Sequence, residues 1–193
     1  MSDLTAVCRR EDALLVVVDV QERLAVTMDR RSEVIAATMR LVKTAQLVGV
    51  PVIVTRQYPE GLGQTERGLE EAIASVEESG HPVHRADKLA FDCFADPGFR
   101  ELVESGGRRQ IVLTGMETHI CIAQTALDAL RSGLEVQIVA DACCSRSAAA
   151  NDVALDRLRG AGAVVTSSES VMYELVGAAG TDEFRGLLRI VKS

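Results

Sequence analysis

The hydrophobic residues of this chain form short uninterrupted runs that alternate with longer amphipathic stretches. Ala13 to Val18 is an apolar run ending at Asp19, which is typical of a strand buried on both faces of a parallel sheet. Arg31 to Val48 has helical periodicity and stops at Gly49, a residue type that often caps helix C-termini. Further strands are expected at 51–55, 81–84, 110–114, 135–140 and 163–165, and further helices after Cys121, at 97–104, at 149–159 and in two shorter stretches near the end.

This alternation predicts the fold class. About six strands with intervening helices indicate a three-layer α/β/α sandwich, Rossmann-like, with a central, mainly parallel sheet and right-handed crossovers. The 193 residues contain no internal repeat, low-complexity tract or domain linker, so we expect one domain over residues 1–193. Residues 56–68, with a proline and three glycines, form the one conspicuous loop, and such a loop is expected to line a site.

Composition narrows the classes of partner. With 21 Lys and Arg against 28 Asp and Glu, a net charge of −7, no basic stripe and only 3% aromatic residues, nucleic acid is not an expected partner. No run approaches the roughly 20 apolar residues that span a bilayer. The acidic start does not resemble a signal peptide, so we expect no membrane partner and a cytoplasmic location. Five cysteines without framework spacing indicate reduced thiols.

Chemically active side chains follow several of the predicted strands. Asp19 ends the first strand, Lys88 lies a few residues past the third, and Cys121 follows the fourth. Because ligands in open parallel sheets bind beyond the carboxyl ends of the strands, we expect these three groups to converge at one edge. The same edge should hold Gln21, Gln57, Tyr58, the segment from Gly115 to Cys121, and Asp141.

Cys121 is the candidate nucleophile, because the helical pattern begins near it. A thiol in the first turn of a helix lies near unpaired N–H groups and the positive end of the helix dipole, which would lower its pKa. The alternative is an inert cysteine buried at a strand–helix junction. Asp19 could equally be a turn or cap residue, and Lys88 a solvated surface residue.

Several short motifs occur in order along nearly the whole chain. They are Val17-Val-Asp-Val-Gln21, Val54-Thr-Arg-Gln-Tyr-Pro-Glu-Gly-Leu-Gly-Gln-Thr65, Lys88 with Phe91, Gly115-Met-Glu-Thr-His-Ile-Cys121, Thr125-Ala-Leu-Asp128, Val139-Ala-Asp-Ala142 and Asp141-Ala-Cys-Cys-Ser-Arg-Ser147. Together they resemble the isochorismatase-like cysteine hydrolases, and most closely the subgroup called isochorismatase-domain-containing proteins. The resemblance implies the isochorismatase-like fold.

The resemblance also implies a mechanism. Cys121 would be the nucleophile, Asp19 the general acid and base, and Lys88 the cation beside them. The backbone amides of Glu117 and Cys121 would form the oxyanion hole, and the Met116–Glu117 peptide bond is expected to be cis. The implied activity is hydrolysis of an amide-type C–N bond of a small molecule through a covalent thioester.

The neighbourhood of these residues supplies pocket candidates and argues against a metal. Nicotinamidases of this superfamily carry metal-binding histidines after the second strand, whereas this chain reads Arg56-Gln57-Tyr58, so no metal and no cofactor are expected. Arg56 either receives a substrate carboxylate or is held in an internal salt bridge. His81 and His84 would point to opposite faces of a strand. The substrate-binding candidates are Gln21, Gln57, Tyr58, Phe91, Thr118 and His119.

Three classes of function remain. The leading one is the small-molecule hydrolase, and all three expected catalytic positions are intact. The second is a non-catalytic small-molecule-binding or scaffolding protein on the same fold. The third is a thiol-redox protein using Cys121 or the Cys143-Cys144 pair, against which stands the lack of a Cys-x-x-Cys motif. Because members of this superfamily commonly form dimers or larger assemblies, we also expect a homo-oligomer.

Overall fold

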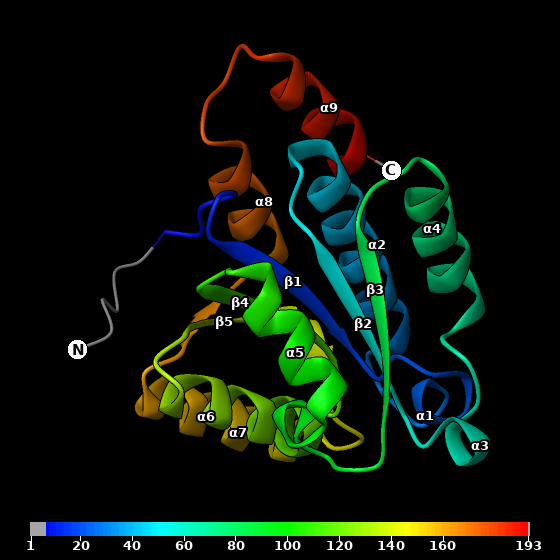
Figure 1. The fold of residues 1–193 in the computed structure, drawn as a ribbon. Coiled ribbons are helices and arrows are strands. Elements are labelled where there is room, and N and C mark those ends of the chain that lie inside the picture. Colours follow the sequence, from blue (N-terminus) through cyan, green and yellow to red (C-terminus); the bar gives the residue numbers. More distant parts are fainter. Residues whose placement is uncertain (1–6, 193) are drawn as a thin grey trace.

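The computed structural model describes residues 7–192 and contains one central sheet (Figure 1). Six strands pair in parallel in the order β3-β2-β1-β4-β5-β6. This confirms the predicted three-layer α/β/α class. The strands are β1 (Ala13–Val18), β2 (Val52–Gln57), β3 (Val83–Lys88), β4 (Gln110–Met116), β5 (Glu135–Cys144) and β6 (Val164–Thr166).

Helices cover both faces of the sheet (Figure 1). One face carries α2 (Arg31–Val48), α4 (Arg67–Glu78), α8 (Ser168–Val176) and α9 (Asp182–Val191), and the other carries α5 (Pro97–Gly106), α6 (Ala123–Arg131) and α7 (Ala148–Ala161). The short helices α1 (Glu22–Ala25) and α3 (Pro59–Leu62) contact each other, and Cys93–Ala95 forms a 3-10 turn. Among residues 7–192, no helix is both long and apolar enough to cross a membrane.

Strand β1 shows why the sheet forms at the centre of the molecule. All six of its residues are apolar and buried. Leu15 and Val17 pack into the core under α2, whereas Leu14, Val16 and Val18 pack into the core on the opposite face. Each such side chain contributes about 1.5–3 kcal/mol when fully buried. A strand buried on both faces therefore requires the continuous apolar run that its sequence has.

Two strands are longer than their sequence pattern predicts. Strand β3 begins at Val83 and continues to Lys88, because its residues pair in register with β2. Its mostly exposed polar residues hide this extension, so Lys88 ends the strand instead of lying past it. Strand β5 continues to Cys144 beyond a register shift opposite Leu113 and Gly115 of β4. Asp141 and both cysteines of the pair therefore lie within β5, not after it.

Helix α4 is absent from the predicted elements. Its buried residues Leu69, Ile73 and Val76 do recur at spacings of four and three, but charged residues dominate the segment. Glu66 caps the helix by accepting a hydrogen bond from the amide of Leu69 at 3.1 Å. Together with α3, this helix reduces the predicted loop to two short connections, and one of them pairs Thr65 with Gln21.

Candidate active site

Asp19 directly follows β1 and has a left-handed backbone, with φ of 52°. A residue other than glycine in this region carries about 1–3 kcal/mol of strain, which persists only where surrounding contacts fix the conformation. Those contacts are present: Thr55 Oγ1 donates to Oδ1 at 2.7 Å, and Lys88 Nζ donates to Oδ2 at 2.6 Å. The side chain is fully buried, so its carboxylate is held from both sides.

Gly115 lets β4 end close to β1. It pairs with Val18, has φ of 120°, and a Cβ atom built at this position would lie 1.9 Å from the Val18 carbonyl oxygen. Only glycine fits this approach. As a result, the turn that follows Met116 begins close to Val18, the residue before Asp19.

Lys88 is buried at the end of β3. Its ammonium contacts Asp19, Gln57 Oε1 at 2.7 Å, and the carbonyl oxygens of Ala90 at 3.3 Å and Phe91 at 3.4 Å. Burial is the largest influence on the pKa of Lys88 and lowers it, but the charge and hydrogen bond of Asp19 together with the nearby thiols of Cys93 and Cys121 outweigh burial, and the net pKa is raised. Lys88 therefore remains charged at neutral pH.

Cys121 lies in a π-helical turn, Thr118–Ile122, directly before α6, and is 5% exposed. Burial raises the pKa of its thiol, and the charge of Asp19 raises it further, against a lowering by Lys88. The lowered pKa predicted from the helix terminus is therefore wrong. One turn of helix dipole is weaker than burial combined with an adjacent carboxylate. The raised pKa favours the thiol form of Cys121, with the carboxylate of Asp19 beside it.

The turn between β4 and α6 has the backbone expected at this point. The Met116–Glu117 peptide bond is cis. Thr118 is buried, and its Oγ1 donates to Asn151 Oδ1 at 2.8 Å. The half-buried His119 places its Nδ1 2.9 Å from Ser145 Oγ. Helix α7 and the loop after β5 therefore hold one predicted substrate-binding residue each, Thr118 and His119, in internal contacts.

Gln21 and Gln57, predicted to bind substrate, are buried and linked to each other. Gln21 Nε2 donates to the carbonyls of Gln57 at 3.1 Å and Gly63 at 2.8 Å, and its Oε1 accepts from the Gln57 amide at 2.8 Å. Gln57 Nε2 donates to the Leu89 carbonyl at 2.7 Å, while its Oε1 accepts from Lys88. Both side chains support β2 and the lysine through these contacts.

Tyr58 and Phe91, by contrast, have exposed side chains. They are 49% and 53% exposed, and Leu89, the residue after β3, is 76% exposed. The Tyr58 amide donates to the Lys88 carbonyl at 2.9 Å, and its ring lies over Gly61. A cavity of about 310 Å³ opens beside them, with Pro59, Lys88, Ala90 and Ala95 among its lining residues.

Arg56 is held in an internal salt bridge, the second of its two predicted roles. Its Nε and Nη2 donate to the two carboxylate oxygens of Asp87 at 2.7 and 2.8 Å. Arg56 lies between Thr55 and Gln57 on β2, and successive strand residues point to opposite faces. It therefore faces away from the side of the sheet that holds Asp19 and Lys88.

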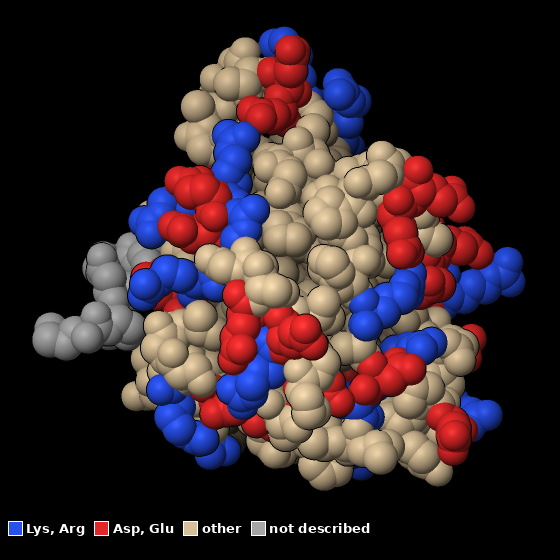
Figure 2. All heavy atoms as spheres, in the orientation of Figure 1, with Lys and Arg blue, Asp and Glu red and all other residues tan. Residues whose placement is uncertain are grey.

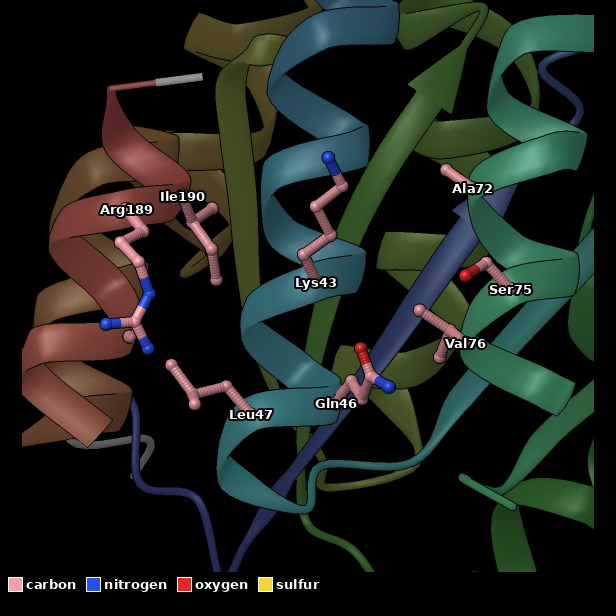
Figure 3. Close-up of a pocket in the computed structure, with 9 residues that line it drawn as sticks. Lys43, Gln46, Leu47, Ala72, Ser75, Val76, Arg189 and Ile190 are labelled. Carbon is pink, nitrogen blue, oxygen red and sulfur yellow. The ribbon is translucent and has the colours of Figure 1, made fainter. Parts of the chain in front are cut away.

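Other polar groups and cavities lie apart from this cluster. Among residues 7–192, no group of three or more His, Cys, Asp or Glu side chains is arranged to hold a metal ion. His81 Nε2 lies 2.8 Å from the Val50 carbonyl oxygen. A cavity of about 610 Å³ lies between α2, α4 and α9 (Figure 3), and none of the three converging groups lines it. Cavity volume therefore does not mark this site.

Two residues near the cluster are missing from the sequence predictions. Thr55 contacts Asp19, and its signal was its position at the end of β2 on the same face as Gln57. Cys93 is fully buried, burial raises its pKa to about 12, and Asp19 and Lys88 both act on its thiol. All five cysteines are free; Cys143 and Cys144 are buried at the end of β5.

Comparisons with known proteins identify the family of the chain. Residues 13–170 match the sequence model described as Isochorismatase domain. The chain therefore belongs to the isochorismatase family, as its motifs predict.

Three proteins illustrate the similarity. Isochorismatase domain-containing protein 1 of Salmo salar is 38% identical over 175 residues, covering 91% of this chain but only 59% of that protein's length. The secreted isochorismatase effector Isc1 of Phytophthora sojae is 35% identical over 93% of this chain and 84% of its own. The structure of MAR1 ribonuclease from Caenorhabditis elegans aligns with a TM-score of 0.88 and 31% identity, covering 97% of this chain and 93% of that one.

Proposed function

We propose that this protein is a metal-independent cysteine hydrolase that cleaves an amide-type C–N bond of a small molecule through a covalent thioester. Asp19, Lys88 and Cys121 would form the catalytic triad. The observation that carries the proposal is the buried carboxylate–ammonium pair, 2.6 Å apart, whose carboxylate acts on the Cys121 thiol. A neutral buried thiol is inert unless a base lies beside it, and Asp19 is that base.

In the proposed first half-reaction, Asp19 accepts the thiol proton as the sulfur of Cys121 bonds to the substrate carbonyl carbon. The carbonyl oxygen becomes an oxyanion held by the backbone N–H groups of Glu117 and Cys121. Lys88 supplies the counter-charge of the buried Asp19 carboxylate and fixes one of its oxygens at 2.6 Å. When the tetrahedral intermediate collapses, the C–N bond breaks and the leaving amine takes the proton from Asp19.

The second half-reaction restores the enzyme. Asp19 accepts a proton from water while the oxygen of that water bonds to the thioester carbon. The C–S bond then breaks, the acid product leaves, and the sulfur of Cys121 regains its proton from Asp19. One carboxylate thus moves a proton in both directions, which requires that it be held in one place, as the contacts from Thr55 and Lys88 provide.

The proposed pocket separates two groups of residues. Tyr58, Phe91 and His119 would contact substrate, since their side chains are not fully buried. Gln21, Gln57 and Thr118 would not contact substrate. They would hold the surrounding residues in place through their internal hydrogen bonds. The ribonuclease activity named for the Caenorhabditis elegans protein is not proposed here. The net charge is −7, and acidic and basic side chains are interspersed on the face seen in Figure 2.

We also propose that the protein forms a homo-oligomer. Leu89 and Phe91, both large, apolar and more than half exposed, lie at the rim of the site, where burial against a second copy would remove them from water. Sedimentation equilibrium at micromolar concentration should show a mass at least twice that of the chain. A purely monomeric species would overturn this part of the proposal.

The test of the proposed reaction is hydrolysis of a panel of small amides and ureides, with detection of the released amine. The natural sequence should turn over at least one compound, and Cys121→Ala should reduce turnover to background. Intact-protein mass spectrometry after rapid acid quench should show an acyl adduct on Cys121. Cys8→Ala is the matched control, since Cys8 is a fully buried free thiol in the opposite core.

Two outcomes would overturn the proposal. Full turnover by Cys121→Ala would exclude the thiol as nucleophile. Compounds that bind and stabilise the protein without any Cys121-dependent amine release would favour the non-catalytic binding protein instead.

A further inference from the structure

Glu117 and Arg146 form an ion pair that joins the turn after β4 to the loop after β5. The Glu117 side chain is 3% exposed, although it is charged. Its Oε2 accepts from the Arg146 amide at 2.9 Å and from Nε at 3.1 Å, and its Oε1 accepts from Nη2 at 2.5 Å. Both the backbone and the guanidinium of Arg146 therefore hold one carboxylate.

This pairing keeps Glu117 ionised. Burial raises its pKa, but the hydrogen bonds and the charge of Arg146 outweigh burial, and the net pKa is lowered. His119, the neighbouring titratable group on the same turn, also lowers it. The planar guanidinium fork fixes the direction of the carboxylate as well as its charge. Arg146 thus restrains the side chain of Glu117. The backbone amide of Glu117 is attached to the same Cα atom.

The same loop and the first turn of α7 restrain the two residues that follow Glu117. Ser145 Oγ contacts the ring of His119 at 2.9 Å, and Asn151 accepts from Thr118 at 2.8 Å. The sheet enforces this contact, because the register shift between β4 and β5 places Cys144 opposite Met116. Three successive residues, 117–119, are therefore held by the loop after β5 and the start of α7, about 30 residues further along the chain.

We propose that Arg146 is a positioning residue of the oxyanion site: by holding the Glu117 carboxylate it orients the Glu117 amide toward the developing oxyanion. This inference rests on the proposed hydrolase function. Oxyanion donors stabilise the transition state only when they are already oriented. The Arg146 side chain is 62% exposed but that of Glu117 is only 3% exposed, so without the arginine fork the buried carboxylate loses the partner that fixes its direction. Loss of the Arg146 side chain should therefore change the orientation of the turn that contains Glu117.

The experiment uses propanal as a probe that needs no knowledge of the substrate. The sulfur of Cys121 bonds to the aldehyde carbon, the thiol proton passes to Asp19, and the former carbonyl oxygen takes the place of the oxyanion. The adduct protects Cys121 from iodoacetamide, which peptide mass mapping measures at pH 8.5. In Arg146→Ala, the propanal concentration for half-protection should rise about tenfold, because a misdirected donor loses part of its stabilisation. The labelling rate without aldehyde should stay within about twofold, since alkylation forms no oxyanion.

Companion variants separate positioning from general damage. Arg146→Lys keeps the charge but not the fork, and should fall between the natural sequence and Arg146→Ala. Glu117→Gln should resemble Arg146→Ala, and the double variant should be no worse than either. Arg159→Ala, which breaks an exposed ion pair with Asp156 on α7, should leave protection unchanged. Circular dichroism melts confirm that each variant is folded.

The outcomes distinguish this inference from the proposed function. Equal protection of Arg146→Ala, Arg146→Lys and the natural sequence overturns the positioning role while leaving the hydrolase standing. Absence of any protection in the natural sequence overturns the oxyanion site, and this inference with it. Equal losses in aldehyde protection and in labelling without aldehyde would show that Arg146 holds the turn together only, and that too rejects the proposal.

Discussion

The ammonium of Lys88 lies 2.6 Å from a carboxylate oxygen of Asp19, and the two side chains are 1% and 0% exposed. They come from the ends of β3 and β1, and Thr55 and Gln57 of the intervening strand β2 contact one each. A pair buried this deeply persists only if its remaining hydrogen-bonding capacity is filled. Three adjacent strands are thus needed to keep two charges out of water.

Removing one partner should destabilise the fold and stop the reaction. Lys88→Met leaves Asp19 buried without its counter-charge, so the free energy of unfolding should fall by about 3–5 kcal/mol. Urea denaturation at pH 7 measures this change. The double variant Asp19→Asn/Lys88→Met should recover part of the loss. The matched control Arg67→Met breaks an exposed pair on α4 and should leave the urea midpoint unchanged; an equal loss in both would contradict the assignment.

The thiol of Cys121 should react as an ordinary buried cysteine in the resting protein. Because burial and Asp19 raise its pKa, the thiolate fraction should be small at pH 7.5 and still rising at pH 10. Asp19→Asn removes the negative charge, so the pKa should fall and iodoacetamide labelling at pH 8.5 should accelerate. Cys144, whose pKa burial raises to about 12, is an internal reference in the same peptide map. A labelling plateau near pH 7 would restore the activated thiolate expected from the sequence.

Substitution of Gln57, which supports Lys88, should lower kcat, whereas substitution of Phe91, which would contact substrate, should raise KM. Gln57→Ala removes the Oε1 that accepts from Lys88, so kcat should fall by about 10- to 100-fold with KM little changed, as for a loss of transition-state alignment. Phe91→Ala removes an exposed ring, so KM should rise while kcat is retained. Steady-state kinetics on whichever amide is turned over measure both constants. The reverse assignment of the two effects would show that Gln57, not Phe91, contacts substrate.

Arg56 should be dispensable for the reaction. Its guanidinium donates to Asp87 through Nε and Nη2 and to Gln64 Oε1 through Nη1, on the face of β2 opposite Gln57. Arg56→Ala should therefore change kcat/KM by less than about twofold and stability by no more than about 1 kcal/mol, as for other partly exposed pairs. A specific loss of activity toward carboxylate-bearing substrates, compared with neutral ones, would instead show that Arg56 receives the substrate.

Much of the fold could be predicted because its signals are local. The apolar run of β1 and the period and glycine cap of α2 specify those elements with little help from the rest of the chain. The polar edge strand β3 could not be read this way, since its apolar residues are sparse. Helix α4 does have a helical spacing at Leu69, Ile73 and Val76, but only these three side chains form its buried face. The limits of both elements depend on pairing with β2 and packing against α2, which only the folded chain supplies.

The site, like the fold, has features that the sequence predicts and features that depend on long-range contacts. Topology alone placed Asp19, Lys88 and Cys121 at one edge of the sheet. The direction of the thiol pKa was predicted wrongly, because the local helix argument omits the burial of the thiol and, after it, the charge of a carboxylate that lies about 100 residues away in the chain. The contacts that occupy Gln21, Gln57 and Thr118 are likewise long-range, and nothing in their local sequence distinguishes a supporting amide or hydroxyl from one that meets substrate.

Strands β1 and β4 pair at the centre of the sheet, and the proposed catalytic residues come from the two halves of the chain that these strands begin. Asp19 and Lys88 precede the exposed glycine Gly107, whereas Cys121 and Arg146 follow it. A backbone cut at that glycine leaves an acid–base fragment and a nucleophile fragment, neither of which holds a complete site. Their reassociation along the β1–β4 seam would regenerate it, so recovered turnover would report fragment complementation directly.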